Sequence, residues 1–170
     1  MKKTPPPSTP PAMERLSELI RDVEVVMLTT VGPDDRLYSR PMAALEFDAA
    51  NGVLWFFTRG SSGKVDSIRE HQNVNLTYGS PGDHRYVSVS GRARVVTDPA
   101  KSLELWRPSL KAFFPNGLDD PDMALLQVQV EGAEYWDSPS SWIVKMLGFA
   151  EGHGMPRIPA GENERIVVAH

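Results

Sequence analysis

Residues Val53–Lys64, with the sequence VLWFFTRGSSGK, join a very apolar run directly to a small polar loop. Aromatic and β-branched residues between Asn51-Gly52 and Gly60 predict a buried strand. Beyond the loop, the three-residue spacing of Val65 and Ile68 predicts the start of a helix. The stretch therefore predicts a strand, a loop and a helix in direct succession.

The loop within this stretch has the chemistry of an anion site. The first N–H groups of a helix, the hydroxyl of Ser62 and the charge of Lys64 together suit a phosphate group. The loop is not a P-loop, because GxxxxGK[ST] requires glycine where Thr58 stands and a hydroxyl residue where Val65 stands. A polar turn with a serine cap and a surface lysine is the alternative reading of the same residues.

Composition limits the class of protein. The chain has 170 residues, 41% hydrophobic and 24% charged, which predicts one soluble domain with a real core. A net charge of −4 gives no general basic field for nucleic acid. Without cysteine there is no disulfide, thiolate nucleophile or cysteine-based metal site, and the four scattered histidines suggest no metal site either.

Targeting signals are not apparent in the sequence. No apolar segment reaches the roughly eighteen residues that a membrane-spanning helix needs. Met1-Lys2-Lys3 is followed by prolines rather than by the apolar region of a signal peptide. The sequence therefore leads us to expect a cytoplasmic protein.

Three regions follow from the distribution of proline and glycine. Residues 1–11 form a Pro-rich tail that we expect to be disordered. Residues 12–150 carry the periodic patterns of one domain, and residues 151–170 form a C-terminal tail, mostly irregular, with a short strand expected at Ile166–Ala169.

The periodic patterns of the domain predict a mainly β fold with flanking helices. An amphipathic helix spans Met13–Val23, and, beyond the helix expected after Lys64, another helix starts at Asp98-Pro99. Six strands are expected, at Val25–Val31, Arg36–Asp48, Val53–Arg59, Asn73–Tyr78, His84–Val96 and Met123–Tyr135. Mostly short turns between them favour an antiparallel barrel. Pro41 has no N–H to donate and must lie at an edge, a bulge or a break in pairing.

Three linked segments, in this order, resemble a known family. They are Ser39-Arg40-Pro41-Met42, Trp55-Phe56-Phe57-Thr58 and Ser62-Gly63-Lys64, followed by YVSVSGRARVVTD at 86–98. Together they are similar to the flavin-binding split-barrel family of pyridoxamine 5'-phosphate oxidases, and most of all to its general-stress-protein branch. The resemblance covers roughly residues 12–150.

The resemblance implies a six-stranded antiparallel split β-barrel that forms a homodimer, with FMN in the clefts between subunits and FAD as the alternative cofactor. Carried over by position, the residues expected at the flavin are Arg40, Pro41 and Met42, the pair Phe57 and Thr58, and the phosphate-holding Ser62 and Lys64. Trp55 shares a strand face with Phe57, so Phe56 points the other way. Trp106 and Trp136 are candidates to reach the flavin from the partner subunit, with plain packing as the alternative.

Two departures from the family pattern argue against oxidation of pyridoxamine phosphate. Oxidases of the pyridoxamine type have a glutamine where this chain has Tyr86, and their C-terminal aromatic-and-arginine motif has no counterpart in GENERIVVAH at 161–170. We therefore expect an FMN-binding protein, an FMN-dependent oxidoreductase with an unknown substrate, that does not oxidise pyridoxamine phosphate. The alternatives are a non-catalytic flavin carrier or stress-linked flavin sensor, or a cleft for haem, pyridoxal phosphate or a deazaflavin. No catalytic residue is predicted.

Overall fold

The computed structural model describes residues 11–137 and the strand at 163–167. The helices are α1 (Pro11–Ile20), α2 (Gly63–Glu70) and α3 (Pro99–Leu105), with short 3-10 segments at Pro81–Asp83, Pro108–Ala112 and Gly117–Asp119. The strands are β1 (Val25–Val31), β2 (Leu37–Ala43), β3 (Glu46–Asp48), β4 (Val53–Arg59), β5 (Asn73–Ser80), β6 (Arg85–Val96), β7 (Met123–Asp137) and β8 (Asn163–Val167). The predictions for residues 1–10 and for most of 151–170 lie outside the described residues.

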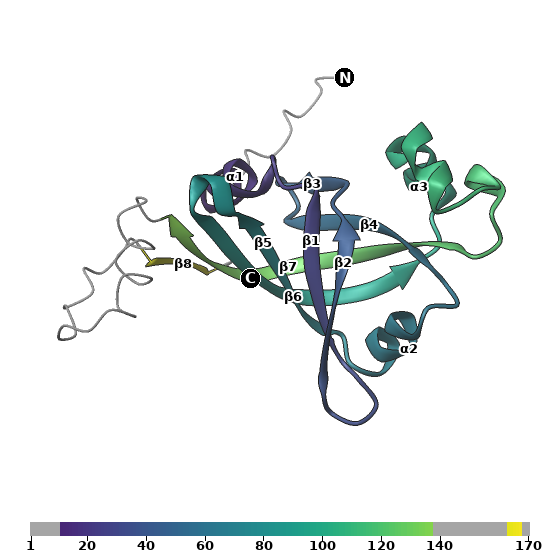
Figure 1. Cartoon of the computed structure of the whole chain (residues 1–170), viewed down its shortest axis with the longest axis horizontal. Coiled ribbons are helices and arrows are strands. Elements are labelled where there is room, and N and C mark those ends of the chain that lie inside the picture. The colour runs from purple at the N-terminus through teal and green to yellow at the C-terminus, as the bar shows by residue number, and fades with distance from the viewer. Residues whose placement is uncertain (1–10, 138–162, 168–170) are drawn as a thin grey trace, which may run out of the picture.

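The strands form one antiparallel sheet that curls into a split barrel (Figure 1). Its order is β2-β1-β5-β6-β7-β4-β3, with β8 paired to β7. Within the described residues the two ends of this order, β2 and β3, do not pair with each other, so the barrel has an open seam. The predicted mainly β split barrel is confirmed. None of the helices in this part of the chain is long and apolar enough to cross a membrane.

The strand count exceeds the predicted six for two reasons. The predicted second strand divides into β2 and β3, because the pairing with β1 ends at Ala43 and the pairing with β4 begins only at Glu46. The strand β8 pairs with β7 and overlaps the short tail strand that was expected at Ile166–Ala169. Pro41 lies in β2, which is the end strand of the sheet, so the prediction of an edge position is confirmed.

The core lies inside the barrel and is closed at one end by α1. Alternate residues of the strands point inward, as Leu54 and Phe56 of β4 do. The apolar face of α1 contributes Met13, Leu16, Leu19 and Ile20, each at most 5% exposed. Each such side chain stabilises the fold by about 1.5–3 kcal/mol through burial. The helix predicted from this pattern is confirmed.

A β-bulge bends the long pair of β6 and β7. Their register shifts between Ser90 and Gly91. A Cβ at position 91 would collide with the backbone carbonyl oxygen of Gln129, so only glycine fits here. The bulge gives the sheet local curvature.

Candidate functional site

The loop between β4 and α2 places Lys64 against two hydroxyl groups. Ser62 occupies the N-cap position of α2 in extended conformation, but its side chain does not cap the helix. Instead, the Lys64 Nζ donates to Ser62 Oγ at 2.8 Å and to Thr58 Oγ1 at 3.0 Å. Thr58 is 3% exposed and lies on the inner face of β4. The predicted phosphate loop therefore brings together the three side chains that the sequence singled out.

Arg40 reaches the same end of the barrel from β2. It pairs in register with Leu28 of β1, so it shares the inward face of these strands. Its Nη1 donates to Thr30 Oγ1 at 2.8 Å, and Thr30 is 1% exposed. Arg40 itself is half-buried. Thus one cation comes from an edge strand and the other from a helix start.

The two cations lie close enough to interact. Burial lowers the pKa of Arg40 below its usual 12.5. Burial and then the charge of Arg40 lower the pKa of Lys64 below its usual 10.5. In residues 11–137 neither side chain forms an ion pair with a carboxylate. Together with the N-terminus of α2, which no side chain caps, these residues define an anion site.

Asp122 holds the loop from the outside. The Ser61 N–H donates to its Oδ1 at 2.7 Å, and the Ser61 hydroxyl donates to its Oδ2 at 2.7 Å. The Gly60 N–H donates to the Asp122 carbonyl at 2.7 Å. The hydroxyl and then the N–H of Ser61 hold the pKa of Asp122 below its usual value. Because Asp122 uses the Ser61 hydroxyl, Ser62 is the loop serine that faces Lys64.

Several predicted flavin residues pack elsewhere in this structure. Phe57, which is 8% exposed, and Trp55 lie on the outer face of β4, in a cluster with the segment after β6. Phe57 meets Trp106 edge to face at 6.0 Å and Phe114 at 6.1 Å between ring centroids. The Lys101 Nζ stands 5.4 Å from the Trp55 ring centroid. These aromatics form a second small core, and a flavin contact from them stays a prediction.

The remaining predicted residues are spread over both faces of the sheet. Met42 is 7% exposed and belongs to the barrel core, whereas Pro41 is exposed on the outer face of β2. Trp136 is 38% exposed and lies opposite Tyr86 where β6 and β7 pair. Neither Pro41 nor Trp136 faces the anion site within one subunit, and their role at a flavin stays a prediction.

Sequence reasoning missed two residues of this site. Thr30 carried a signal, because strand alternation places it on the same face as the buried Leu28, where a polar residue is unusual. Asp122 carried none, because it stands 61 residues from Ser61 and only the pairing of β4 with β7 brings the two together.

Comparison with known proteins shows the family. Residues 11–153 match the family model described as pyridoxamine 5'-phosphate oxidase like. The chain therefore belongs to this family, as the three sequence segments indicated.

Several relatives share the fold. The general stress FMN/FAD binding protein of Xanthomonas citri is 31% identical, with a TM-score of 0.64 over 76% of this chain and 90% of that chain. General Stress Protein 26 of Bacillus anthracis str. Sterne is 26% identical, with a TM-score of 0.66 over 75% of this chain and 95% of that chain. In sequence, Protein bli-3 of Neurospora crassa is 28% identical over an alignment of 135 residues, and the match covers 75% of this chain and 65% of that protein. This chain thus spans less than two thirds of that relative's length.

Proposed function

We propose that the chain binds FMN, with the phosphate held by Arg40, Ser62 and Lys64. The observation that carries this proposal is the pair of half-buried cations that has no carboxylate partner in the described residues. A bound dianion would relieve the repulsion between them and would accept charge-assisted hydrogen bonds from both. The residues present fit the phosphate of a flavin mononucleotide, and the similar Xanthomonas citri protein is named as FMN/FAD binding.

We propose further that the protein is an FMN-dependent oxidoreductase. When bound, the flavin supplies the hydride or electron transfer. Arg40 and Lys64 anchor and orient it by its phosphate, and Thr30 and Thr58 fix the two cations through the hydrogen bonds described above. The groups around the anion site are cations and hydroxyls, which supports a role for this end of the barrel in holding the phosphate of the cofactor.

A second copy of the chain is the proposed partner. The outer face of β1 and β2 exposes Val25 at 56%, Met27 at 40% and Leu37 at 71% of their surfaces. The polar pair of Thr29 and Ser39 lies on the same face, between Met27 and Leu37. Large exposed apolar side chains gathered on one face of a sheet are typical of an interface. We propose that a homodimer buries this face and completes the flavin site from both subunits. Pro41, on the same face as Met27, would then lie at the interface.

The test is an absorption spectrum of the freshly purified protein, followed by titration of the flavin-free protein with FMN and, in parallel, FAD. Flavin bands, or saturable FMN binding near one per subunit, support the proposal. If neither flavin bands nor saturable FMN binding is observed, the proposed flavin-binding function is wrong, although the fold is unaffected. The ratio of the two affinities decides between FMN and FAD.

Turnover separates the oxidoreductase from a carrier or sensor. The flavin-loaded protein is mixed with reduced nicotinamides and other donors, and flavin reduction is followed by its absorbance. Repeated reduction and reoxidation supports the oxidoreductase. Tight binding with no reduction across the panel supports a carrier or sensor built on the same site.

A further inference from the structure

Two exposed arginines lie side by side on the outer face of β6, directly after its bulge. Arg92 and Arg94 are exposed, whereas Ala93 between them is buried. On the neighbouring strand, Gln129 pairs in register with Arg92 and Gln127 pairs with Arg94, so the four side chains share one face of the sheet. They line a hollow of about 250 Å³ on the outside of the barrel.

Hydrogen bonds fix part of this hollow and leave donors available. The Arg94 Nε donates to Gln127 Oε1, and the Gln129 Nε2 donates to two backbone carbonyls of the turn before β4. No described residue accepts a hydrogen bond from Arg92. Its N–H groups, which form a planar fork of donors, therefore remain available to a ligand.

The lack of a carboxylate partner sets these two arginines apart in an acidic chain. The net charge is −4, and carboxylates outnumber the cations that could pair with them. Five other exposed arginines in residues 11–137 each pair with an aspartate or a glutamate; they are Arg15, Arg21, Arg36, Arg59 and Arg69. Arg92 and Arg94 form no such ion pair with the described residues.

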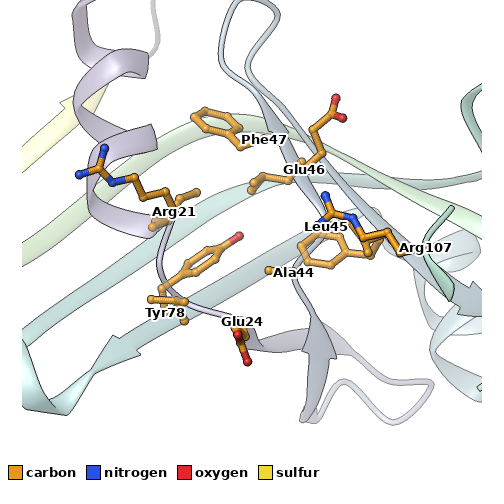
Figure 2. Close-up of a pocket in the computed structure, with 12 residues that line it drawn as sticks. Arg21, Glu24, Ala44, Leu45, Glu46, Phe47, Tyr78 and Arg107 are labelled. Carbon is orange, nitrogen blue, oxygen red and sulfur yellow. The ribbon is translucent and has the colours of Figure 1, made fainter. Parts of the chain in front are cut away.

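Another hollow of the same protein has charges of both signs. Figure 2 shows it next to the segments that precede β1 and β3, and its charged lining residues are Arg21, Arg107, Glu24 and Glu46. By contrast, no carboxylate of the described residues lines the hollow on β6 and β7, and Gln72 adds a further amide there. This second hollow therefore offers positive charge and N–H donors to an anion.

The spacing of the two guanidinium groups suits an anion with two negative groups. Residues that lie two apart on a strand are separated by about 7 Å along the strand. Each guanidinium can direct two parallel N–H groups at one phosphate, which is the geometry in which arginine binds phosphate. Two linked phosphate groups can therefore each meet one guanidinium, and their charge then matches both arginines.

We propose that this hollow is a second anion site, which binds the diphosphate group of a small molecule between Arg92 and Arg94. The amide N–H groups of Gln72 and Gln127 donate to the remaining phosphate oxygens. The site is separate from the proposed flavin phosphate site, because it shares no residue with that site and lies on the outer face of the sheet.

The test uses the full chain with pyrophosphate as the probe and inorganic phosphate as the comparison. Lys64→Met serves as the background, so that the proposed flavin site contributes little to binding of the probe. Calorimetry measures the affinity, and the shifts of backbone N–H signals in ¹⁵N spectra locate the probe. We expect saturable binding at low ionic strength, at least about tenfold tighter for pyrophosphate than for phosphate, with the shifts at residues 92–94 and 127–129. Added salt should weaken the binding, because exposed charges are screened.

Two variants test the arginines themselves. Arg92→Gln and Arg94→Gln each remove one guanidinium and keep an amide. We expect each to lower the pyrophosphate affinity about tenfold, the effect of losing a charge-assisted hydrogen bond. Arg36→Gln is the matched control, because it removes the same charge from an exposed arginine that pairs with Asp34.

A titration with ADP identifies the source of the diphosphate group. Tighter binding of ADP than of pyrophosphate assigns the site to nucleotides, and the reverse order assigns it to inorganic diphosphate.

The proposal is overturned if pyrophosphate shows no saturable binding, since the arginines then serve only as solvated surface groups. It is equally overturned if Arg92→Gln and Arg94→Gln bind pyrophosphate as tightly as Arg36→Gln does, or if the shifts appear around residues 40 and 64 instead.

Discussion

The guanidinium charge of Arg40 adds to burial in lowering the pKa of Lys64. The two residues come from β2 and α2, which are separate elements, and each is held by a threonine hydroxyl of the barrel. The fold thus keeps two like charges close together in a half-buried place. Such an arrangement is unfavourable by itself and becomes favourable when an anion lies between the charges.

Removal of Lys64 should weaken FMN binding strongly. Lys64→Met loses a charge-assisted hydrogen bond to phosphate, worth about 1.5–3 kcal/mol, or roughly tenfold to hundredfold in affinity. Fluorescence titration of the flavin-free protein measures the change. Arg69→Met is the matched control, because Arg69 is an exposed cation of the same helix. Equal affinities of the two variants would contradict the phosphate site.

The lowered pKa of Lys64 predicts a pH-dependent stability in the flavin-free protein. Below the lowered pKa, Lys64 is charged in both folded and unfolded states, and the cost of burying it is fully present. As pH rises toward 10.5, the folded state loses its proton first, so the free energy of unfolding should rise relative to Lys64→Met. Thermal melts of both proteins between neutral pH and 10.5 check this, and parallel curves would refute it.

Asp122 should support FMN binding without touching the phosphate. Asp122→Ala removes two acceptors from Ser61, so the loop that carries Ser62 loses its support. We expect a loss of roughly twofold to tenfold in FMN affinity, smaller than for Lys64→Met, with a partial recovery in Asp122→Asn. Asp119→Ala is the control, because Asp119 is an exposed carboxylate nearby in sequence. An Asp122→Ala affinity equal to that of Asp119→Ala would exclude the positioning role.

Gly91 should tolerate no side chain. Gly91→Ala drives a methyl group into the carbonyl of Gln129, and we expect a loss of about 1–3 kcal/mol in the free energy of unfolding. Gly82→Ala is the matched control, because no atom lies within 4 Å of a Cβ built there. Urea denaturation compares the two. A Gly91→Ala protein as stable as Gly82→Ala would show that the bulge relaxes around the methyl group.

The apolar outer face should control assembly. Met27→Lys places a charge on the exposed face of β1, which we propose is covered by the partner subunit. We expect a change from dimer to monomer in analytical ultracentrifugation, together with weaker FMN binding. Leu103→Lys is the control, because Leu103 is 65% exposed on α3, away from this face. A monomeric wild type, or a dimeric Met27→Lys, would rule out this interface.

Local patterns in the sequence predicted most of the fold. The apolar runs of β1 and β4, the alternation in β5 and β6, the amphipathic face of α1 and the edge position of Pro41 all follow from neighbouring residues. The Ser62 and Lys64 pair was also visible locally, because a strand, a loop and a helix start occur within a dozen residues. The anion site could therefore be located from one stretch of chain.

What the sequence did not predict depends on contacts between distant segments. Asp122 meets Ser61 only because β7 pairs with β4. The sequence of β5 alternates normally and gives no sign that the hydroxyl of Tyr78 lacks a hydrogen-bond partner among the described residues. Whether a buried polar group is hydrogen-bonded depends on its neighbours in space, which the sequence does not show. The seam that separates β2 from β3 also required the three-dimensional order of the strands.

The dependence of the loop on Asp122 has a consequence for the order in which the protein matures during synthesis. β7 lies between β6 and β4 in the sheet and leaves the ribosome after every other strand of the order from β2 to β3. Until it emerges, β4 lacks its main neighbour and the loop at Gly60 and Ser61 lacks its acceptors. A nascent chain that ends before Asp122 therefore contains Arg40 and Lys64 but lacks the contacts that position the loop of Lys64. The flavin binding that we propose would therefore be a late event, possible only once the barrel is complete.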